Sequence, residues 1–483
     1  MHSSVILRVV GVLLMLFSFS MVPPIVVAFI YNDSGLQPFL AAFLITLLSG
    51  LFIWLPVQHK KAELRTRDGF VVVVLFWTVL ALSGSLPLYL SPQPDMSFTD
   101  AFFESLSGLT TTGATVLTGL DELPKSILYY RQQLQWLGGM GIVVLAVAVL
   151  PMLGIGGMQL YRAETPGPIK DSKLTPRIKE TAKALWYIYL TLTISCVIAY
   201  WAAGMELFDA ICHGFSTVAI GGFSTHDKSI GYFNSPLIEA ITMFFMLTSA
   251  VNFALHFMTR HRGSIRHYFR DPELKVMFGF ITAISLVVCL SLYIGGTYDS
   301  PLQALRYGLF QTISIATTTG YGLQDFSVWP SLIPIVLLMA SFVGACAGST
   351  GGGLKVMRVL LLFKQGSREI RRLVHPNAVF LVKIGNSAVP DRVIEAVWGF
   401  VGAYLALFII LMLAVMATGL DFTSGFSAVA ASMNNLGPGL GSVANHYGDI
   451  SSPTKWILCF AMLLGRLEIF TLLVLFSPTF WRR

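Results

Sequence analysis

The feature that most constrains this chain is a series of long apolar runs that contain no charged residue. A helix that crosses the ~30 Å hydrocarbon core of a bilayer needs about 20 predominantly apolar residues. One run, 456–477, is long enough but carries Arg466 and Glu468. Nine others are free of charge and lie at 9–30, 35–58, 69–94, 132–161, 184–205, 240–259, 276–298, 326–354 and 396–420. The sequence therefore predicts an all-α polytopic membrane protein.

The composition excludes a set of soluble domains. Only 12% of the 483 residues are charged, whereas a soluble protein carries about 25%, and no polar linker divides the chain. The five cysteines lie inside apolar stretches without paired spacing, which indicates neither a disulfide nor a metal cluster. The first run follows Arg8 and could be read as a signal peptide. It is longer than the apolar region of such peptides and lacks a clear cleavage site, so we expect a retained helix.

The basic residues predict the orientation of the spans. Cytoplasmic loops retain Lys and Arg, and 26 of the 32 basic residues fall in six segments that share one side if ten helices cross. These segments are the N-terminus through residue 8, 59–68, 162–183, 260–275, 355–392 and the C-terminal pair. We therefore expect both termini in the cytoplasm. The net charge of +7 is a topology signal, and it does not indicate nucleic-acid binding.

Four apolar stretches between the spans, all on the outer side, are too short to cross a membrane. Their glycines Gly113, Gly222, Gly320 and Gly437 are separated by 109, 98 and 117 residues. Aligned on these glycines, the stretches read FTDAFFESLSGLTTTGAT (98–115), LFDAICHGFSTVAIGGFS (207–224), LRYGLFQTISIATTTGYG (305–322) and FTSGFSAVAASMNNLGPG (422–439). A repeat of this period indicates four units, each with a span, a re-entrant segment and a second span.

Such a segment has a physical use at membrane depth. A short helix descending from the outer face points its negative C-terminal end toward the membrane centre, where it stabilises a cation. Carbonyls of the extended residues that follow can replace the hydration shell of an ion, and glycine reaches the backbone angles required. Asp100 and Asp209 stand where N-caps of the first two helices are expected. Four such segments around an axis predict a pore, although each glycine by itself could also serve helix packing.

At these residues the chain resembles the Trk/Ktr/HKT superfamily of potassium transporters, and within it the bacterial TrkH/TrkG type. The motifs that carry the resemblance cover most of the chain: TTTGAT (110–115), AIGGFSTHD (219–227), ATTTGYG (316–322), CAGSTGGGLK (346–355), NNLGPGLG (434–441) and GRLEIFTLLVLFSPTFW (465–481). The resemblance implies four pseudo-repeated helix, pore helix and helix units around one pore plus two N-terminal transmembrane helices. The two helices are expected in 1–58 and the units at 69–161, 184–259, 276–365 and 391–483.

The resemblance also implies the setting of the protein. It places the chain in the bacterial inner membrane, with the entrance of the filter on the periplasmic side. K⁺ is the expected transported ion, and no organic cofactor is expected in this chain. The implied assembly is a homodimer in the lipid bilayer above a cytosolic ring of TrkA-like nucleotide-binding regulatory subunits.

The selectivity glycines of the family map onto the four aligned glycines. Members that favour sodium carry serine at the first of these positions, so glycine at Gly113 indicates potassium. By the same resemblance, carbonyls of the residues just before the glycines form neighbouring layers: Thr111, Thr112, Ile220, Gly221, Thr318, Thr319, Asn435 and Leu436. These columns differ in chemistry, which leaves the number of well-defined ion sites open.

Two features near the middle of the membrane are candidates for a gate. A lipid-facing charge at the position of Arg466 costs at least ~2.5–3.5 kcal/mol, so this side chain must face protein or water. The resemblance makes it an electrostatic barrier below the filter, and the alternative is an arginine satisfied by helix C-terminal carbonyls. The segment 344–353 disfavours a continuous helix, and the resemblance makes it an intramembrane gating loop, with small-residue packing as the alternative. Its candidate residues are Gly344, Gly348, Ser349, Thr350, Gly351, Gly352 and Gly353.

Other functions remain as alternatives. Obligatory proton coupling would require buried acids such as Glu104 or Glu468 to relay protons, but neither has an obvious partner in the sequence. An enzyme should show a catalytic cluster, yet the nine histidines are scattered and no catalytic ATP motif is present. A receptor has no evident use for a fourfold re-entrant repeat. The basic stretch 355–372 is expected to anchor on lipid and could also dock the regulatory ring.

Overall fold

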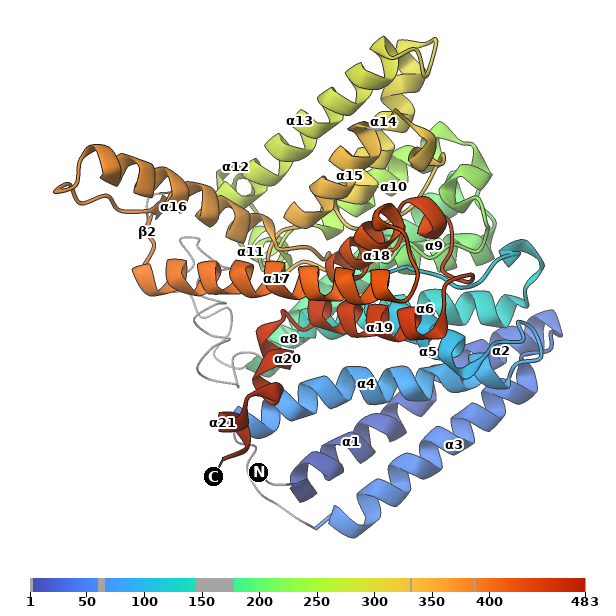
Figure 1. The fold of residues 1–483 in the computed structure, drawn as a ribbon. Coiled ribbons are helices and arrows are strands. Elements are labelled where there is room, and N and C mark those ends of the chain that lie inside the picture. Colours follow the sequence, from blue (N-terminus) through green and yellow to red (C-terminus); the bar gives the residue numbers. More distant parts are fainter. Residues whose placement is uncertain (1–2, 60–65, 145–177, 331, 386, 483) are drawn as a thin grey trace.

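The computed structural model describes residues 3–59, 66–144, 178–330, 332–385 and 387–482 (Figure 1). Within these ranges the chain is helical except for loops and one hairpin of two-residue strands, β1 (Lys383–Ile384) and β2 (Ser387–Ala388). The helices are α1 (Ser3–Ser18), α2 (Val22–Tyr31), α3 (Leu36–Trp54), α4 (Thr66–Leu90), α5 (Phe98–Leu109), α6 (Lys125–Val144), α8 (Ile178–Ala202), α9 (Leu207–Ala219), α10 (Pro236–Ser249), α11 (Phe253–Arg262), α12 (Arg266–Arg270), α13 (Pro272–Ile294), α14 (Pro301–Ala316), α15 (Leu332–Val343), α16 (Val356–Val374), α17 (Asp391–Ala417), α18 (Phe422–Asn434), α19 (Ser452–Arg466), α20 (Phe470–Leu473) and α21 (Pro478–Trp481).

Among the described residues, six helices are long and apolar enough to cross a membrane. They are Ser3–Tyr31, Leu36–Val57, Arg67–Leu90, Ala182–Ala202, Pro272–Ile294 and Asp391–Ala417. Two bent pairs, α10 with α11 and α19 with the segment Phe470–Phe476, would raise the number to eight. The prediction of an all-helical, multi-span membrane protein is therefore confirmed. The second part of the 132–161 run and most of the basic segments 59–68 and 162–183 lie outside the described residues.

Local sequence explains where several of these helices begin. A Ser or Asp followed by Pro occurs at the start of α10 and α13, where Ser235 and Asp271 accept hydrogen bonds from the N–H groups of Ile238 and Leu274. This arrangement satisfies N–H groups that a helix leaves free at its first turn, and proline at the first position lacks that N–H. The starts of these helices are therefore encoded locally.

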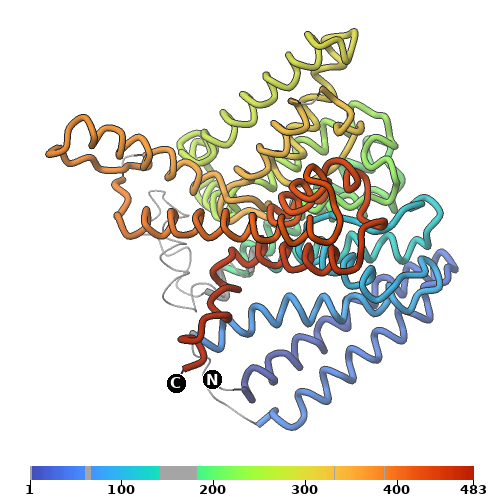
Figure 2. The backbone as a smooth tube through the Cα atoms, in the orientation of Figure 1, coloured from blue at the N-terminus to red at the C-terminus, as the bar shows by residue number. Residues whose placement is uncertain are grey.

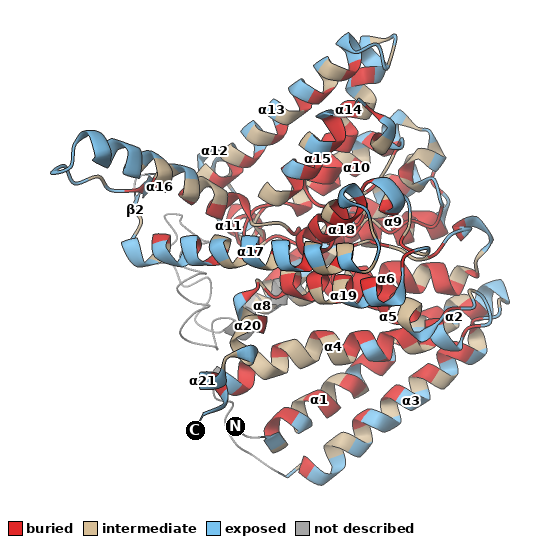
Figure 3. Ribbon diagram, viewed as in Figure 1, coloured by how far each residue is buried: buried red, intermediate tan, exposed pale blue. Residues whose placement is uncertain are grey.

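The four predicted units have the same order of elements, and each unit packs on the next. A long helix precedes each short one: α4 before α5, α8 before α9, α13 before α14 and α17 before α18. Between units, α6 contacts α9, α10 contacts α14, α15 contacts α18, and α19 contacts α5. This last contact joins the fourth unit to the first, so the contacts form a closed circle. Figure 3 shows that buried residues concentrate on the short helices, while α3, α13 and α17 expose much of their surface.

The two N-terminal helices, α1 and α3, pack closely on each other outside this circle. A Cβ atom on Gly11 would lie 2.8 Å from the carbonyl oxygen of Gly50, and one on Gly50 would lie 2.8 Å from that of Gly11. Small residues allow such close backbone approach between membrane helices. The N- and C-terminal ends of the described chain lie at the same end of the bundle (Figures 1 and 2). There Arg67, at the start of α4, donates to the carbonyl oxygen of Arg482 at 2.6 Å.

Three of the predicted spans are not straight helices. The 240–259 run bends by 90° between α10 and α11, and the 456–477 run bends by 109° after Arg466. Among the described residues of the 326–354 run, only Leu332–Val343 is α-helical, and a loop continues to α16. The break predicted inside this run is confirmed. The bends of the other two runs were not predicted: residues 250–252 and 467–469, which separate the paired helices, include no proline or glycine, although Gly465 stands just before the second bend.

Candidate functional site

The four short helices α5, α9, α14 and α18 end in the same backbone conformation. Two residues before each aligned glycine, the chain is left-handed, with φ of 52° at Thr111, 56° at Ile220, 67° at Thr318 and 52° at Asn435. The residue that follows each left-handed residue donates its N–H to the carbonyl oxygen of the residue five positions earlier, with N···O distances of 2.8–2.9 Å. This bond is the signature of a Schellman helix end. The side chains of the four segments differ, but their backbones follow one pattern.

The glycines Gly113, Gly222, Gly320 and Gly437 meet in what we call the glycine ring. Each has positive φ, between 79° and 94°. A Cβ atom on each would meet the carbonyl oxygen of the residue that precedes the glycine of the next unit. These contacts run from Gly113 to Gly221, from Gly222 to Thr319, from Gly320 to Leu436 and from Gly437 to Thr112. The ring is closed, and it brings the twelve sequence-predicted residues of the four segments together.

Glycine is required in this ring for two independent reasons. A side chain is strained at these φ values, and the neighbouring carbonyl leaves no room for it. At Gly437 the nearest carbonyl oxygen would lie 2.8 Å away, and the other three positions are tighter. With four helix C-termini and rows of carbonyls around it, the ring has the chemistry of a cation-binding site.

The predicted N-caps of the short helices were wrong by three residues. Asp100 and Asp209 lie in the first turns of α5 and α9, whose N-caps are Ser97 and Glu206. The Ser97 hydroxyl accepts from the Asp100 N–H at 3.2 Å and donates to the Asp100 carboxylate at 2.8 Å. The first of these bonds is that of an N-cap serine, and the second ties the acidic side chain three positions later to the same hydroxyl. The carboxylates still lie at the helix N-termini, where the helix dipole favours them.

The segment 344–355, which we call the central loop, lies against the C-terminal ends of the short helices. The hydroxyl of Thr350 donates to the carbonyl of Val218 at 3.1 Å. The N–H of Gly352 donates to the Thr318 hydroxyl at 2.7 Å, and that of Gly353 donates to the Asn434 carbonyl at 3.1 Å. The central loop thus touches three of the four units. Of the predicted loop residues, Gly344, Ser349, Thr350, Gly351 and Gly352 are buried, and Gly348 and Gly353 are half-buried.

The bend between α10 and α11 also belongs to the surroundings of the central loop. The N–H of Cys346 donates to the Ala250 carbonyl at 3.0 Å, and the N–H of Phe253 donates to the Gly348 carbonyl at 3.0 Å. The side chain of Asn252 caps α11 through the Ala254 N–H at 2.8 Å. Backbone groups freed by the bend are therefore satisfied by the loop, which is the condition for broken helices inside a membrane.

Arg466 is the last residue of α19, and its buried side chain reaches the central loop. Its Nη1 donates to the carbonyl of Thr350 at 3.4 Å, and its Nη2 donates to the carbonyl of Gly138 at 3.2 Å. The guanidinium also lies over the ring of Trp77, 5.5 Å from its centroid. The two candidate gate elements are therefore in contact. Neither carbonyl lies at a helix C-terminus, where the structural alternative expected them: Thr350 belongs to the central loop and Gly138 lies inside α6.

The two acids considered for proton relay are both paired with arginine. Glu104 lies 2.7 Å from Arg131, and both side chains are fully buried. Glu468, at the bend after α19, lies 2.8 Å from Arg358 in the first turn of α16. Sequence reasoning missed both pairs because their members come from different helices. The signal that pointed to Arg131 was its place among the few basic residues outside the cytoplasmic segments.

His226, in the loop that follows the second glycine segment, joins the first two units. Its Nδ1 contacts the Asp121 carboxylate, and its Nε2 lies 3.2 Å from the carboxylate of Asp209. The ring stacks on Tyr232 and lies parallel to that of His213. Burial lowers the pKa of His226, but the hydrogen bonds to both carboxylates outweigh burial, so its pKa is raised above the usual value of 6.5.

This contact predicts a pH-dependent stability. Because the folded-state pKa of His226 is raised, its stabilisation is complete below pH 6.5 and is lost as the pH rises through the folded-state pKa. We expect the melting temperature of the detergent-solubilised protein to fall by about 2 °C over that window, relative to a His226→Gln variant. Parallel melting curves of the two proteins from pH 6 to 9 would contradict this assignment.

Comparison with known proteins agrees with this architecture. The TrkH family model, described as "Cation transport protein", matches residues 35–483. The chain is 58% identical over 480 residues to the Trk system potassium uptake protein TrkH of Vibrio parahaemolyticus, with 99% of each covered. It is 44% identical over 481 residues to TrkG of Escherichia coli, covering 100% of this chain and 99% of the relative. The crystal structure of the potassium transporter TrkH from Vibrio parahaemolyticus matches with a TM-score of 0.93 and 55% identity over all of both chains. The chain therefore belongs to the TrkH family of cation transport proteins.

Proposed function

We propose that this chain takes up potassium through a single pore formed by four pseudo-repeated units, with the glycine ring as its selectivity filter. The observation that carries the proposal is the closed circle of four left-handed glycines, each against a carbonyl of the next unit. The units are 69–161, 184–259, 276–365 and 391–483, and the two helices in 1–58 lie outside them. The names of the relatives, potassium uptake proteins of the Trk system, support potassium as the ion.

In this proposal, backbone carbonyls replace the water around the ion. The four glycines and the two residues before each supply the carbonyl layers, and the C-terminal ends of α5, α9, α14 and α18 add a favourable potential for a cation. The carbonyl of Gly221 also accepts a hydrogen bond from Gln135 at 2.6 Å. In the fourth segment the carbonyl of Gly437 accepts from the Tyr447 hydroxyl at 2.8 Å instead, so the layers are not fourfold symmetric.

Passage below the filter is controlled by the central loop and Arg466. The loop contacts the ends of the short helices through Thr350, Gly352 and Gly353. Arg466 donates a hydrogen bond to the carbonyl of Thr350, so its positive charge and the closed loop together block the path of the ion. Displacement of the loop would break this contact and open the path. A cation that enters a negative-inside cell gains about 2.3 kcal/mol per 100 mV, which drives uptake without an ATPase.

The proposed setting is the inner membrane of a bacterium, with both termini in the cytoplasm and the filter entrance on the periplasmic side. The 26 basic residues in six segments support this orientation. The common position of the two ends of the described chain supports it as well (Figure 2). We further propose a homodimer and a TrkA-like cytosolic ring as partners, because the relatives are components of a Trk system. Helix α16 extends away from the bundle and is the part that contacts such a ring in this proposal (Figure 1).

Two experiments test the function. Expression in a bacterium that lacks its own potassium uptake systems, together with the regulatory subunit, should restore growth at low external potassium. Purified protein in liposomes should then show a reversal potential set by the potassium gradient alone. A reversal potential that follows an imposed proton gradient would instead establish proton-coupled symport. Failure to restore growth despite normal membrane expression would contradict potassium uptake.

A further inference from the structure

We propose that Arg131 and Gln135, one turn apart on α6, are positioning residues that determine ion selectivity. They do so by holding the second segment of the glycine ring against the first. This inference rests on the proposed function of the ring as a selectivity filter. Arg131 is one of only six basic residues outside the cytoplasmic segments, so the rule that orients the spans does not explain it.

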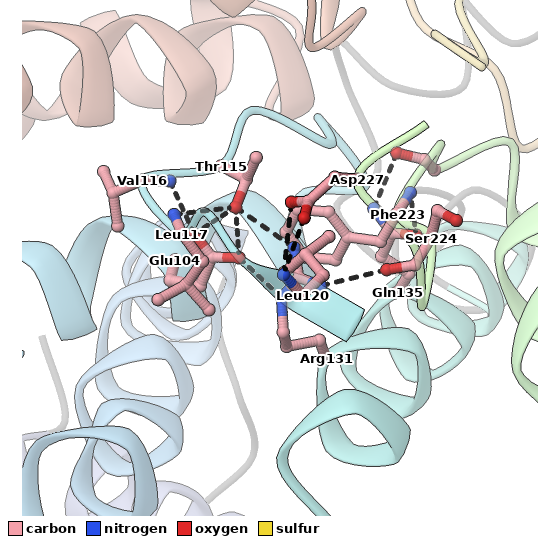
Figure 4. A network of polar contacts seen from close by, with 11 residues as sticks. Glu104, Thr115, Val116, Leu117, Leu120, Arg131, Gln135, Phe223, Ser224 and Asp227 are labelled. Carbon is pink, nitrogen blue, oxygen red and sulfur yellow. Dashed lines mark hydrogen bonds and ion pairs between the residues drawn. The ribbon is translucent and has the colours of Figure 1, made fainter. Parts of the chain in front are cut away.

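The guanidinium of Arg131 bridges two units just outside the ring (Figure 4). Its Nη1 donates to the carbonyl of Ser224 at 3.1 Å, and its Nη2 donates to the hydroxyl of Thr115 at 3.1 Å. Thr115 and Ser224 each lie two residues after a glycine of the ring, one in the first unit and one in the second. One side chain therefore joins equivalent positions of neighbouring segments. Its plane also lies over the ring of Phe223, 4.3 Å from the centroid.

Glu104 of α5 fixes the guanidinium and the first segment together. Its carboxylate accepts a hydrogen bond from the Nε–H of Arg131 at 2.7 Å. The same carboxylate accepts from the Thr115 hydroxyl at 2.9 Å and from the Val116 N–H at 2.9 Å. Both partners of the pair are fully buried, so the charges compensate each other in a medium of low dielectric. Neither side chain can move without leaving a buried charge unsatisfied.

Gln135 forms hydrogen bonds with the second segment on both sides of Gly222. Its amide Nε2 donates to the carbonyl of Gly221 at 2.6 Å, and its Oε1 accepts from the N–H of Phe223 at 3.1 Å. The carbonyl of Gly221 is also the atom that a Cβ on Gly113 would meet. A shift of this carbonyl therefore changes the wall that the first glycine faces. Residues that hydrogen-bond to ligating groups limit how far those groups can move to fit an ion.

The chemistry of the two side chains suits this role. The planar fork of arginine donates to three acceptors in a fixed geometry, whereas lysine presents one flexible point charge. Without the fork, the two segments can relax independently of each other. Carbonyls that relax can close around sodium, which is smaller than potassium, and discrimination between the two ions then decreases.

The test compares Arg131→Lys and Gln135→Leu with a matched control, Arg306→Lys. Arg306 lies at the opposite end of α14 from Gly320. It forms a comparable pair with Glu239, at 2.7 Å and 2.5 Å, and its other hydrogen bond goes to Asn234 at 3.1 Å. Reversal potentials under opposed potassium and sodium gradients are measured for the purified proteins in lipid bilayers. We expect the potassium to sodium permeability ratio to fall about fivefold in both α6 variants, the factor that corresponds to one net hydrogen bond. The Arg306→Lys ratio should equal that of the wild type.

The outcomes separate this inference from the proposed function. A wild-type protein that does not select potassium would overturn the proposed function itself. A selective wild type with equally selective, folded α6 variants would overturn only the positioning role, because a purely structural contact changes the amount of protein and not its selectivity. If Arg131→Lys fails to fold, Gln135→Leu decides, since it removes no charge.

Discussion

Serine at position 113 is expected to lower the potassium to sodium permeability ratio at least about tenfold, a difference of about 1.4 kcal/mol between the two ions. Gly113 has φ of 80°, and a Cβ there would collide with the carbonyl oxygen of Gly221. The backbone of one of the two segments must shift to relieve the collision, because the carbonyl oxygen of Gly221 is fixed by a 2.6 Å hydrogen bond from the side-chain amide of Gln135. The added hydroxyl also brings a new oxygen to the ring. Both effects change the spacing of ligands that potassium selectivity requires.

A control is needed because serine also strains a left-handed backbone. Gly204 has φ of 95°, and a Cβ there meets nothing within 4 Å. Gly204→Ser therefore carries the conformational strain without the collision, and its permeability ratio should match that of the wild type. Gly437→Ser is expected to have a smaller effect than Gly113→Ser, since its nearest carbonyl would lie 2.8 Å away. Unchanged discrimination in Gly113→Ser, measured by reversal potentials in bilayers, would exclude the glycine ring as the filter.

Removal of the Arg466 side chain is expected to raise potassium flux at least about tenfold. A unit charge about 5 Å from a passing cation contributes a barrier of about 3 kcal/mol at an effective dielectric of about 20. Arg466→Ala removes this barrier and also the hydrogen bond to Thr350, which helps to hold the central loop in place. Both changes act in the same direction. The measurement is the rate of potassium-dependent flux into liposomes at equal protein content.

The matched variant for this experiment is Arg466→Lys, which keeps the positive charge but loses the two-armed contact with Thr350 and Gly138. If the charge is the main barrier, the lysine variant should retain low flux. High flux in both variants would assign the obstacle to the loop contact instead. Normal expression of Arg466→Ala with unchanged flux would show that the arginine only supports the fold through its carbonyl partners.

The bend that follows Arg466 is joined to α16 by an ion pair. Two residues beyond Arg466, Glu468 has φ of 53° and pairs with Arg358 of α16 at 2.8 Å. Arg358 is buried and lies over the ring of Phe400, 4.1 Å from its centroid. The bend that positions Arg466 is therefore attached to the helix that extends away from the bundle (Figure 1).

Several features could be predicted because they depend on short stretches of sequence. The length and apolarity of a span are local, so α3, α13 and α17 were expected where they occur. The left-handed ends of the four short helices were not predicted, although a Schellman end closes within six residues, because the left-handed residues are not glycines. The break in the run 326–354 followed from the glycines between Gly344 and Gly353, which disfavour a helix wherever they stand.

Other features depended on partners distant in the chain. The bend at Ala250–Asn252 exists because the central loop, about 100 residues later, supplies acceptors and donors for the freed backbone groups. The pairs of Glu104 with Arg131 and of Glu468 with Arg358 join different helices, so no spacing rule relates their members. Asp100 and Asp209 lie in the first helical turn and not at the cap, because an acid is favoured near a helix N-terminus at either place.

The sequence by itself determined the membrane class, the four repeated segments and the four glycines, because each follows from apolar length or from a backbone conformation only glycine adopts easily. The tertiary structure decided how those segments are held. Closure of the ring depends on contacts between residues about 100 positions apart and, for Gly437 and Thr112, 325 positions apart. Its bracing by Arg131 and Gln135 depends on side chains of a helix outside it. Such contacts satisfy buried polar groups that have no local partner, and a partner across the fold leaves no periodic trace in the chain.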